Sequence, residues 1–162
     1  MSLERGAVKP YSLKVRTGLE VTVFVTRTAG SEVLIVHRSP EQGGYWHVVA
    51  GGVEPGETVA EAAERELREE TDLSAKPAAG VDVCEYVDPL TDEPANRRNQ
   101  YDPSVAEVEV TCFHVTAPDE WEPRLDWEHD DHRWCAPGEA FALLRWPATA
   151  GALRTLLMPE AS

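Results

Sequence analysis

The stretch GGVEPGETVAEAAERELREETDL, residues 51–73, joins a glycine turn to a segment that is rich in glutamate and has the character of a helix. Within it, Glu66, Glu69 and Glu70 stand at positions i, i+3 and i+4, so a helix places their carboxylates on one face. We expect these carboxylates to converge on one small volume, where they repel one another unless a cation neutralises them, and Glu70 to be an exposed ligand. Mg²⁺ and Mn²⁺ prefer oxygen ligands and are the natural candidates. The stretch therefore predicts a divalent metal site.

A helix over residues 59–71 is predicted from its start signal and its apolar spacing. Thr58 and Glu61 have the spacing of a capping box, in which a hydroxyl and a carboxylate bind the first free backbone amides. Arg65 lies one turn before Glu69, so we expect it to hold a glutamate in orientation from behind the metal ligands. An apolar stripe suited to packing on a sheet is formed by Ala60, Ala63 and Leu67. The helix thus has one face for a ligand and another for a core.

The stretch resembles the Nudix box, Gly-x5-Glu-x7-Arg-Glu-U-x-Glu-Glu-x-Gly-U, in which U is an aliphatic residue. The matching residues are Gly51, Glu57, Arg65, Glu66, Leu67, Glu69, Glu70 and Leu73. Asp72 stands where the family has glycine, and aspartate is among the few residues that tolerate the left-handed conformation expected there. The run Arg-Glu-Leu-Arg-Glu-Glu alone is typical of a solvated helix face. Together with Gly51 and Glu57 at the family's spacing, it instead favours a metal site.

The rest of the sequence fits one α/β domain. Residues 19–25 and 32–37 have the composition of strands, and the turn signal at 28–31 between them predicts a hairpin. Further strands are expected at residues 81–86 and 105–115, and helices are expected to begin at Pro137 and Pro147. The resemblance implies a Nudix-type α/β/α sandwich with a mixed β-sheet, formed by residues 1–162 as a single domain.

The composition of the 162-residue chain limits the kinds of partner. Its 29 Asp and Glu residues against 15 Lys and Arg give a net charge of −14, which argues against a nucleic-acid polymer because phosphate contacts require basic patches. No apolar run suits a membrane span or a signal peptide, so we expect a cytoplasmic protein with no membrane partner. Three widely spaced cysteines, Cys84, Cys112 and Cys135, favour reduced thiols over a disulfide framework or a zinc site. A small phosphorylated, nucleotide-like substrate is the expected partner, and the oligomeric state, a homodimer included, is left open.

The resemblance also implies roles for residues of the box. The implied metal ligands are Gly51, Glu66, Glu69 and Glu70, holding Mg²⁺ or alternatively Mn²⁺. The implied catalytic residues of the box are Glu57, Arg65, Glu69 and Glu70. In this set, Glu57 is expected to orient Arg65 rather than to bind the metal.

Candidate residues outside the box are expected to contact substrate or water. Glu128, in the acidic stretch 126–134, is expected to serve as a further metal ligand or as general base, against its alternative interpretation as part of a solvated turn. Arg38 and Trp46 are candidates for gripping a phosphate and lining the pocket. The long polar loop 88–104 is expected to govern specificity. Its candidate substrate contacts are Arg97, Arg98 and Tyr101, the last of which alternatively anchors the loop by packing.

These features imply a Nudix pyrophosphohydrolase that cleaves a phosphoanhydride bond in a nucleoside diphosphate joined to a group X. The first expected substrate is a (deoxy)nucleoside or pterin triphosphate, giving monophosphate and pyrophosphate. Residues 46–51 lack the proline and first glycine of the usual family lead-in, as in the branch acting on dihydroneopterin triphosphate and dATP. Alternatives are hydrolysis of diadenosine polyphosphates, indicated by Glu128 and His129, or of ADP-ribose, indicated by Pro89. An isopentenyl diphosphate isomerase and a nucleotide-binding regulator without turnover are further alternatives, the regulator disfavoured because all four box glutamates are present.

Overall fold

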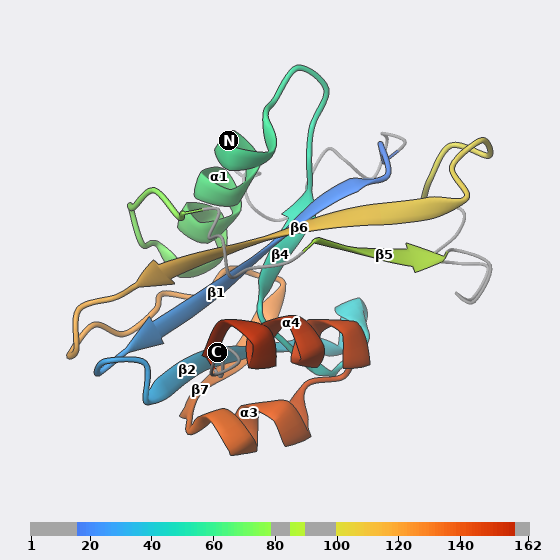
Figure 1. Ribbon diagram of the computed structural model, residues 1–162. Coiled ribbons are helices and arrows are strands. Elements are labelled where there is room, and N and C mark those ends of the chain that lie inside the picture. The colour runs from blue at the N-terminus through green and yellow to red at the C-terminus, as the bar shows by residue number, and fades with distance from the viewer. Residues whose placement is uncertain (1–15, 79–84, 90–99, 158–162) are drawn as a thin grey trace, which may run out of the picture.

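The computed structural model describes residues 16–78, 85–89 and 100–157 of the chain (Figure 1). Within these ranges, the strands are β1 (Leu19–Arg27), β2 (Glu32–Arg38), β3 (Trp46–His47), β4 (Val49–Gly52), β5 (Glu85–Pro89), β6 (Glu107–Thr116) and β7 (His129–Cys135). The α-helices are α1 (Val59–Thr71), α3 (Pro137–Leu143) and α4 (Pro147–Leu157), and a 3-10 turn, η2, spans Pro40–Gln42.

The strands form one mixed sheet in the order β3-β2-β1-β6-β5, with β4 paired to β1 and β7 paired to β2. β1 runs parallel to β6, and the other pairs of strands are antiparallel. β1 and β2 pair only beside their connecting turn, at Thr26 with Val33 and Arg27 with Glu32. The rest of β2 is therefore available to pair with β3 and β7.

Different helices cover the two faces of the sheet. In β1, Val21, Val23 and Val25 pack into a core that includes α1, whereas Phe24 packs into a second core with α3 and α4. This division arises because successive side chains of a strand point to opposite faces. Figure 1 shows α1 on one side of the sheet and α3 with α4 on the other. The predicted α/β/α sandwich with a mixed sheet is confirmed.

α1 packs on the sheet through a face that contains two glutamates as well as apolar residues. The side chains of Ala62, Ala63 and Leu67 are fully buried, and Glu66 and Glu70 are buried beside them. The prediction of an apolar stripe is wrong at Ala60, which is exposed. The helix is rotated so that Glu66 and Glu70, rather than Ala60, face the sheet, whereas Glu69 is exposed.

The predicted elements agree with the structure where the sequence pattern was periodic. α1 has the predicted bounds, the β1–β2 hairpin is confirmed, and α3 and α4 begin at the predicted prolines. The strand expected at 81–86 appears as β5 from Glu85 onward, whereas residues 81–84 lie outside the described residues. The short strands β3 and β4 were not predicted.

The alternative interpretation of the acidic stretch as a solvated turn does not hold from residue 129 onward, because His129–Cys135 forms β7. This strand pairs with β2 along most of its length. Its charged residues Asp130, Asp131 and Arg133 are exposed, while His129 and Cys135 at its two ends are buried. Pairing to β2 therefore outweighs the low strand propensity of the acidic residues, as tertiary context often does.

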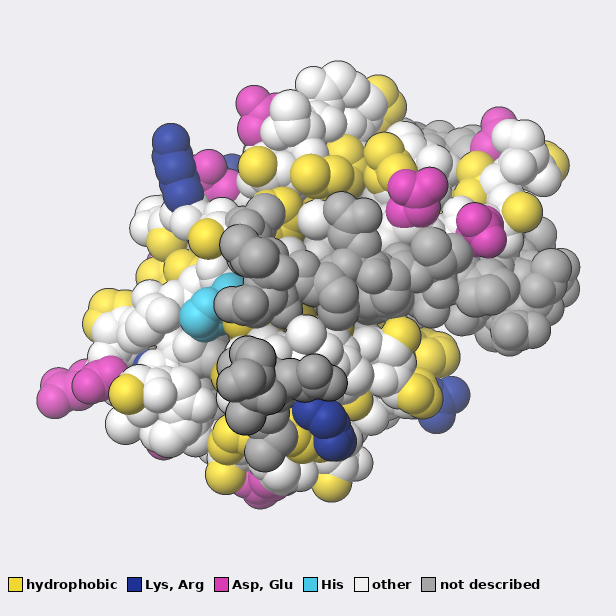
Figure 2. Space-filling model, viewed as in Figure 1, with side chains coloured by type: hydrophobic (Ala, Val, Ile, Leu, Met, Phe, Trp, Pro, Cys, Tyr) yellow, Lys and Arg dark blue, Asp and Glu magenta, His cyan; other side chains and the backbone are white. Residues whose placement is uncertain are grey.

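Two of the cysteines, Cys112 and Cys135, are buried and form no disulfide bond among the described residues, as expected, and Cys84 lies outside these residues. No helix within the described ranges combines the length and apolar character needed to cross a membrane. On the face shown in Figure 2, the described Lys and Arg side chains stand apart from one another and form no continuous basic patch.

Candidate active site

The ends of α1 have the geometry expected from the sequence. The backbone N–H of Glu61 donates to the Thr58 hydroxyl, and the Thr58 N–H donates to the Glu61 carboxylate, both over 3.0 Å. At the other end, Asp72 adopts a left-handed conformation with φ of 68° and donates its N–H to the carbonyl of Arg68. Aspartate therefore takes the place of the family's glycine without disturbing the helix end.

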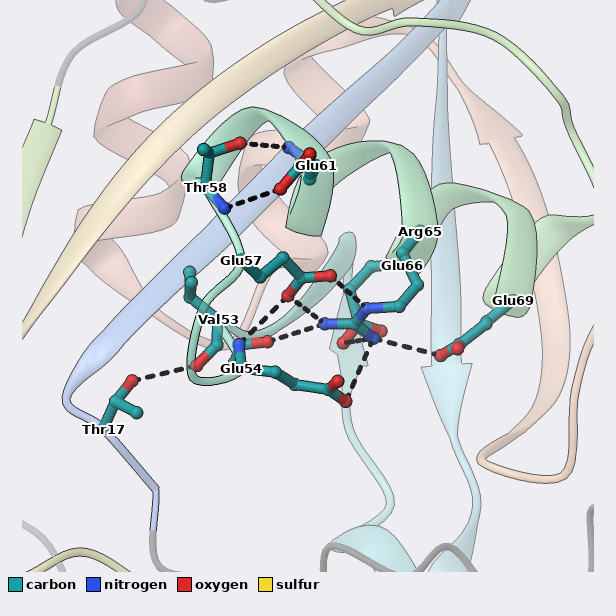
Figure 3. Close-up of polar contacts among 10 residues, drawn as sticks. Thr17, Val53, Glu54, Glu57, Thr58, Glu61, Arg65, Glu66 and Glu69 are labelled. Atoms are coloured by element: carbon teal, nitrogen blue, oxygen red, sulfur yellow. Dashed lines mark hydrogen bonds and ion pairs between the residues drawn. The ribbon is translucent and has the colours of Figure 1, made fainter.

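The guanidinium group of Arg65 forms hydrogen bonds to several residues of the site (Figure 3). Its Nε donates to Glu57 Oε2 over 2.7 Å, and Nη2 donates to Glu57 Oε1 over 3.0 Å and to the Gly52 carbonyl over 2.9 Å. Nη1 donates to Glu66 over 3.0 Å and to Glu69 over 3.3 Å. The planar fork thus ties the turn before the helix to two glutamates of the helix itself.

The charges of this network support one another. The hydrogen bonds from Arg65 hold the pKa of the Glu57 carboxyl below its usual range, even though partial burial acts in the opposite direction. Burial also disfavours the charged form of Arg65, but the hydrogen bond to Glu57 and the charges of Glu66 and Glu69 outweigh it and raise the pKa of the guanidinium. The geometry is that of a rigid support for the helix glutamates.

Gly51 in β4 lies directly against Glu66. A Cβ atom added to Gly51 would stand 2.1 Å from Glu66 Oε2 and 2.2 Å from its Cδ. Contacts this short do not occur between unmoved atoms, so any larger residue here would displace the Glu66 carboxylate, and glycine is favoured for reasons of space rather than of backbone conformation. The carboxylate of Glu66 therefore packs directly against β4, and only 5% of the residue is exposed.

Glu70 is the most deeply buried acidic residue of the site, with 1% of its surface exposed. Its Oε1 accepts a long hydrogen bond of 3.4 Å from the Ala50 N–H, while its Oε2 has no hydrogen-bond partner among the described residues. Burial, together with the nearby charges of Glu66 and Glu128, raises the pKa of Glu70 well above its usual range. The expectation of an exposed glutamate is therefore wrong, because this face of α1 is turned toward the sheet.

The segment between β6 and β7, together with the first residue of β7, supplies a second group of side chains around Glu70. Glu128 is buried, and its carbonyl accepts from the Ser39 N–H over 2.9 Å. His129 Nε2 lies 3.8 Å from Glu70 Oε1, and its Nδ1 lies 2.9 Å from Asp126 Oδ1. Arg38, whose charge also acts on Glu70, pairs with His129 across β2 and β7. The structure thus brings the candidates Arg38 and Glu128 to Glu70.

This segment is held in place from β1 and from α1. Arg27 donates to the Trp121 carbonyl over 2.7 Å and to Glu122 over 3.0 Å. The Arg124 N–H donates to the Thr71 carbonyl at the end of α1 over 2.9 Å. These contacts fix the path of the chain just before the acidic residues that approach Glu70.

Other candidates do not reach this site. Trp46 packs against His37, with ring centroids 4.9 Å apart, and belongs to the core on the side of α3 and α4, away from α1. Tyr101 is buried and donates its hydroxyl hydrogen bond to Glu20, so it anchors its loop by packing. Arg97 and Arg98 lie outside the described residues.

A family model described as the NUDIX domain matches residues 16–156, a range that runs from before β1 to the last turn of α4. The chain belongs to the NUDIX domain family. The family expected from the box is therefore confirmed, and with it the assignment to a family of hydrolases.

Known Nudix proteins and other relatives resemble this chain to different extents. An octanoyltransferase of Myxococcus xanthus is 36% identical over 122 residues, which are 70% of this chain and 29% of that protein. The 8-oxo-dGDP phosphatase NUDT18 of Homo sapiens is 36% identical over 66 residues, which are 40% of this chain and 20% of that protein. The chain thus spans less than a third of the length of these curated relatives.

Among solved structures, the dihydroneopterin triphosphate pyrophosphohydrolase of E. coli superposes with a TM-score of 0.73 at 22% identity. The match covers 90% of this chain and 99% of that one. At this level of identity, the likeness shows the shared Nudix fold.

The donor set of this Nudix domain fits a divalent cation, although no cage is preformed. Among the described residues, no three His, Cys, Asp or Glu side chains already stand so as to hold a metal ion together. Arg65 Nη1 contacts both Glu66 and Glu69, and the charge of Glu66 also acts on Glu70, whose Oε1 faces His129. The buried Oε2 of Glu70 nevertheless lacks a hydrogen-bond partner among these residues, and carboxylate oxygens are the ligands that Mg²⁺ prefers. A cation there would offset the buried negative charge.

Asp126 and His129 lie in the acidic stretch 126–134 that the sequence singled out, but sequence reasoning gave neither of them a role in the site. Their spacing of three residues was a usable signal, because it lets a carboxylate reach the ring of a following histidine in a turn. Their approach to Glu70 depends on β7, which was not predicted. In the sequence, His129 served only, together with Glu128, as an indication of diadenosine polyphosphate hydrolysis.

Proposed function

We propose that this Nudix domain hydrolyses a diphosphate linkage in a nucleoside diphosphate joined to a group X. The first candidate is a (deoxy)nucleoside or pterin triphosphate, which would yield a monophosphate and pyrophosphate. The observation that carries the proposal is the buried meeting of Glu70 with Glu66 and Glu128, beside a helix whose glutamates are supported by Arg65. A buried concentration of carboxylates is costly to stability, so its presence indicates a functional role.

Three box glutamates and a backbone carbonyl would hold the divalent cation. They are Glu66, Glu69, Glu70 and Gly51, with Mg²⁺ as the expected ion and Mn²⁺ as the alternative. When bound, the cation would offset the charge of the phosphates and lower the pKa of a coordinated water. Arg65, kept in place by Glu57, would fix the positions of the glutamates as they turn toward the ion.

Glu128 is the proposed general base. Its carboxylate is buried next to Glu70, away from bulk water, which suits a group that must take a proton from the attacking water. The attacking water would lose that proton to Glu128 as the bond to phosphorus forms. Arg38, at the end of β2 near Glu70, would hold a non-bridging phosphate oxygen and stabilise the charge on the departing phosphate.

The identity of the nucleoside is a finer proposal, supported by the relatives. Human NUDT18 is described as a phosphatase of 8-oxo-dGDP, and it is 36% identical to this chain over the matched 66 residues. This match favours purine deoxynucleotides, oxidised ones included, as the first substrates to test. Diadenosine polyphosphates are the second candidate, favoured by the position of Glu128 and His129 beside Glu70.

The test is hydrolysis of a panel of compounds with and without Mg²⁺ or Mn²⁺. The panel comprises the nucleoside triphosphates, 8-oxo-dGDP and 8-oxo-dGTP, dihydroneopterin triphosphate, diadenosine polyphosphates and ADP-ribose. Products are separated by chromatography, and inorganic pyrophosphatase reveals any pyrophosphate released. Cation-dependent turnover of one class supports the proposal and names the substrate. Tight nucleotide binding with no turnover of any compound would instead favour a regulator without catalytic activity.

A further inference from the structure

His129 stands at the first position of β7 with its side chain completely buried. Two carboxylates flank the ring. Asp126 Oδ1 lies 2.9 Å from Nδ1, and Glu70 Oε1 lies 3.8 Å from Nε2. Nε2 has no hydrogen-bond partner among the described residues. The ring therefore connects a residue of the loop to a residue of α1.

The backbone fixes where this ring can lie. The pairing of β2 with β7 shifts register between His37 and Arg38, and Arg38 is paired with His129 beyond the shift. The His129 N–H also donates to the Asp126 carbonyl over 3.3 Å, which closes the turn before the strand. Asp126 thus holds His129 through both its backbone and its side chain. Because a carboxylate accepts hydrogen bonds, the contact with Asp126 requires a hydrogen on Nδ1, and the edge of the ring that bears Nε2 is directed at Glu70.

The contacts of Glu70 are divided between its two carboxylate oxygens. Oε1 lies between the Ala50 N–H, at 3.4 Å, and His129 Nε2, at 3.8 Å. Oε2 has no hydrogen-bond partner among the described residues. The terminal torsion of a glutamate is broad, so the side chain alone does not determine which oxygen faces the site. Groups that lie against one oxygen determine the orientation of the other.

We propose that His129, held by Asp126, is a positioning residue that turns the Glu70 carboxylate so that Oε2 is presented to the cation. The inference rests on the proposed function, since it assigns a role around one of the metal ligands. In this role, His129 touches neither substrate nor cation, and it acts only through the orientation of Glu70. Residues that orient a metal ligand contribute a factor of about 10 to 100 to metal affinity or activity.

The same pair of strands offers a matched control. His37 Nδ1 lies 2.7 Å from Asp130 Oδ1, so it forms a second histidine–aspartate pair. His37 packs against Trp46 on the side of the sheet away from α1. A substitution of His37 therefore removes a similar pair from the same strands without approaching Glu70.

Two substitutions of His129 separate its two nitrogen atoms. His129→Asn keeps a nitrogen near the position of Nδ1 and removes the atom facing Glu70. His129→Gln keeps a nitrogen near the position of Nε2 and gives up the contact with Asp126. The binding of Mg²⁺ and Mn²⁺ alone is measured by calorimetry for both variants and for His37→Asn, together with kcat, KM and thermal unfolding.

We expect His129→Asn to weaken cation binding by about 10- to 100-fold and to lower kcat by a similar factor. KM for the nucleotide should stay within about threefold, because substrate contacts are unchanged. His129→Gln should recover most of the cation affinity, and His37→Asn should behave as the wild type. Wild-type cation affinity and kcat in His129→Asn would overturn the inference while leaving the proposed function intact. Equal losses in Asn and Gln variants, accompanied by a lowered unfolding temperature, would also overturn it by showing a structural role only. A wild-type protein that neither binds the cations nor turns over any substrate would refute the proposed function, and the inference with it.

Discussion

Replacing Gly51 by alanine tests whether the close packing of the Glu66 carboxylate against β4 is needed for cation binding and turnover. The added Cβ would stand 2.1 Å from Glu66 Oε2, whereas ordinary contacts begin at 3.4 Å. The carboxylate therefore has to move by more than about 1 Å, a displacement that can cost on the order of 100-fold in rate when a catalytic group is involved. Moving it also breaks the 3.0 Å hydrogen bond from Arg65.

The expected loss of stability is smaller than the loss of activity. The clash falls on the end of a side chain, which can rotate, but the residue is 5% exposed and has little room. Loss of a charged hydrogen bond and slight overpacking together cost about 1–3 kcal/mol in the free energy of unfolding. We therefore expect Gly51→Ala to fold, to unfold at a lower denaturant concentration, and to lose about 100-fold in kcat.

Denaturant unfolding, calorimetric titration with Mg²⁺ and steady-state kinetics measure these effects. Gly151→Ala in α4 is the control, because its new Cβ meets nothing within 4 Å and its turnover should not change. This control should be more stable by about 0.5–1 kcal/mol, since alanine favours a helix over glycine. Combining Gly51→Ala with the shorter Glu66→Asp should give a smaller loss of stability than the sum of the two single changes. Wild-type turnover and cation affinity in Gly51→Ala would refute the close packing of Glu66 as a requirement.

Three further predictions concern the charges of the site. Glu70→Gln should reduce turnover by about 1000-fold or more. It should also stabilise the cation-free protein by about 1–3 kcal/mol, because it removes a buried charge. Undiminished turnover would contradict the role of Glu70 as a cation ligand. Arg65→Lys should lower kcat and destabilise the protein by about 2–4 kcal/mol, because lysine cannot make the paired hydrogen bonds of the guanidinium group to Glu57 and the Gly52 carbonyl. Chemical denaturation measures the loss of stability. An unchanged denaturation midpoint would contradict the prediction. The pKa of Glu57 is lowered in the folded state by Arg65, so its contribution to stability is complete above the unfolded-state pKa and lost as pH falls through the folded-state pKa. Acid titration of unfolding should show this loss in the wild type and a weaker dependence in Glu57→Gln.

The box helix shows how far sequence reasoning reached. The capping box of Thr58 and Glu61, the left-handed Asp72 and the contact of Arg65 with Glu69 all lie within a few residues of chain. Interactions of this range depend on helix geometry alone, so their spacing predicts them. The family followed from the same spacing. The rotation of α1 did not follow from this spacing. The prediction that Ala60 packs on the sheet was wrong because the docking of a helix depends on the surface that it meets.

Spacing along the chain was enough to predict the class of fold, the bounds of α1 and a set of candidate cation ligands. The burial of Glu70, the contact of Gly51 with Glu66, and the approach of His129 and Asp126 to Glu70 were found only in three dimensions. These contacts join β4, α1 and the start of β7, which are distant in the chain. Local propensity carries no information about such pairings, because they form only when the strands have found their register and both faces of the sheet are covered.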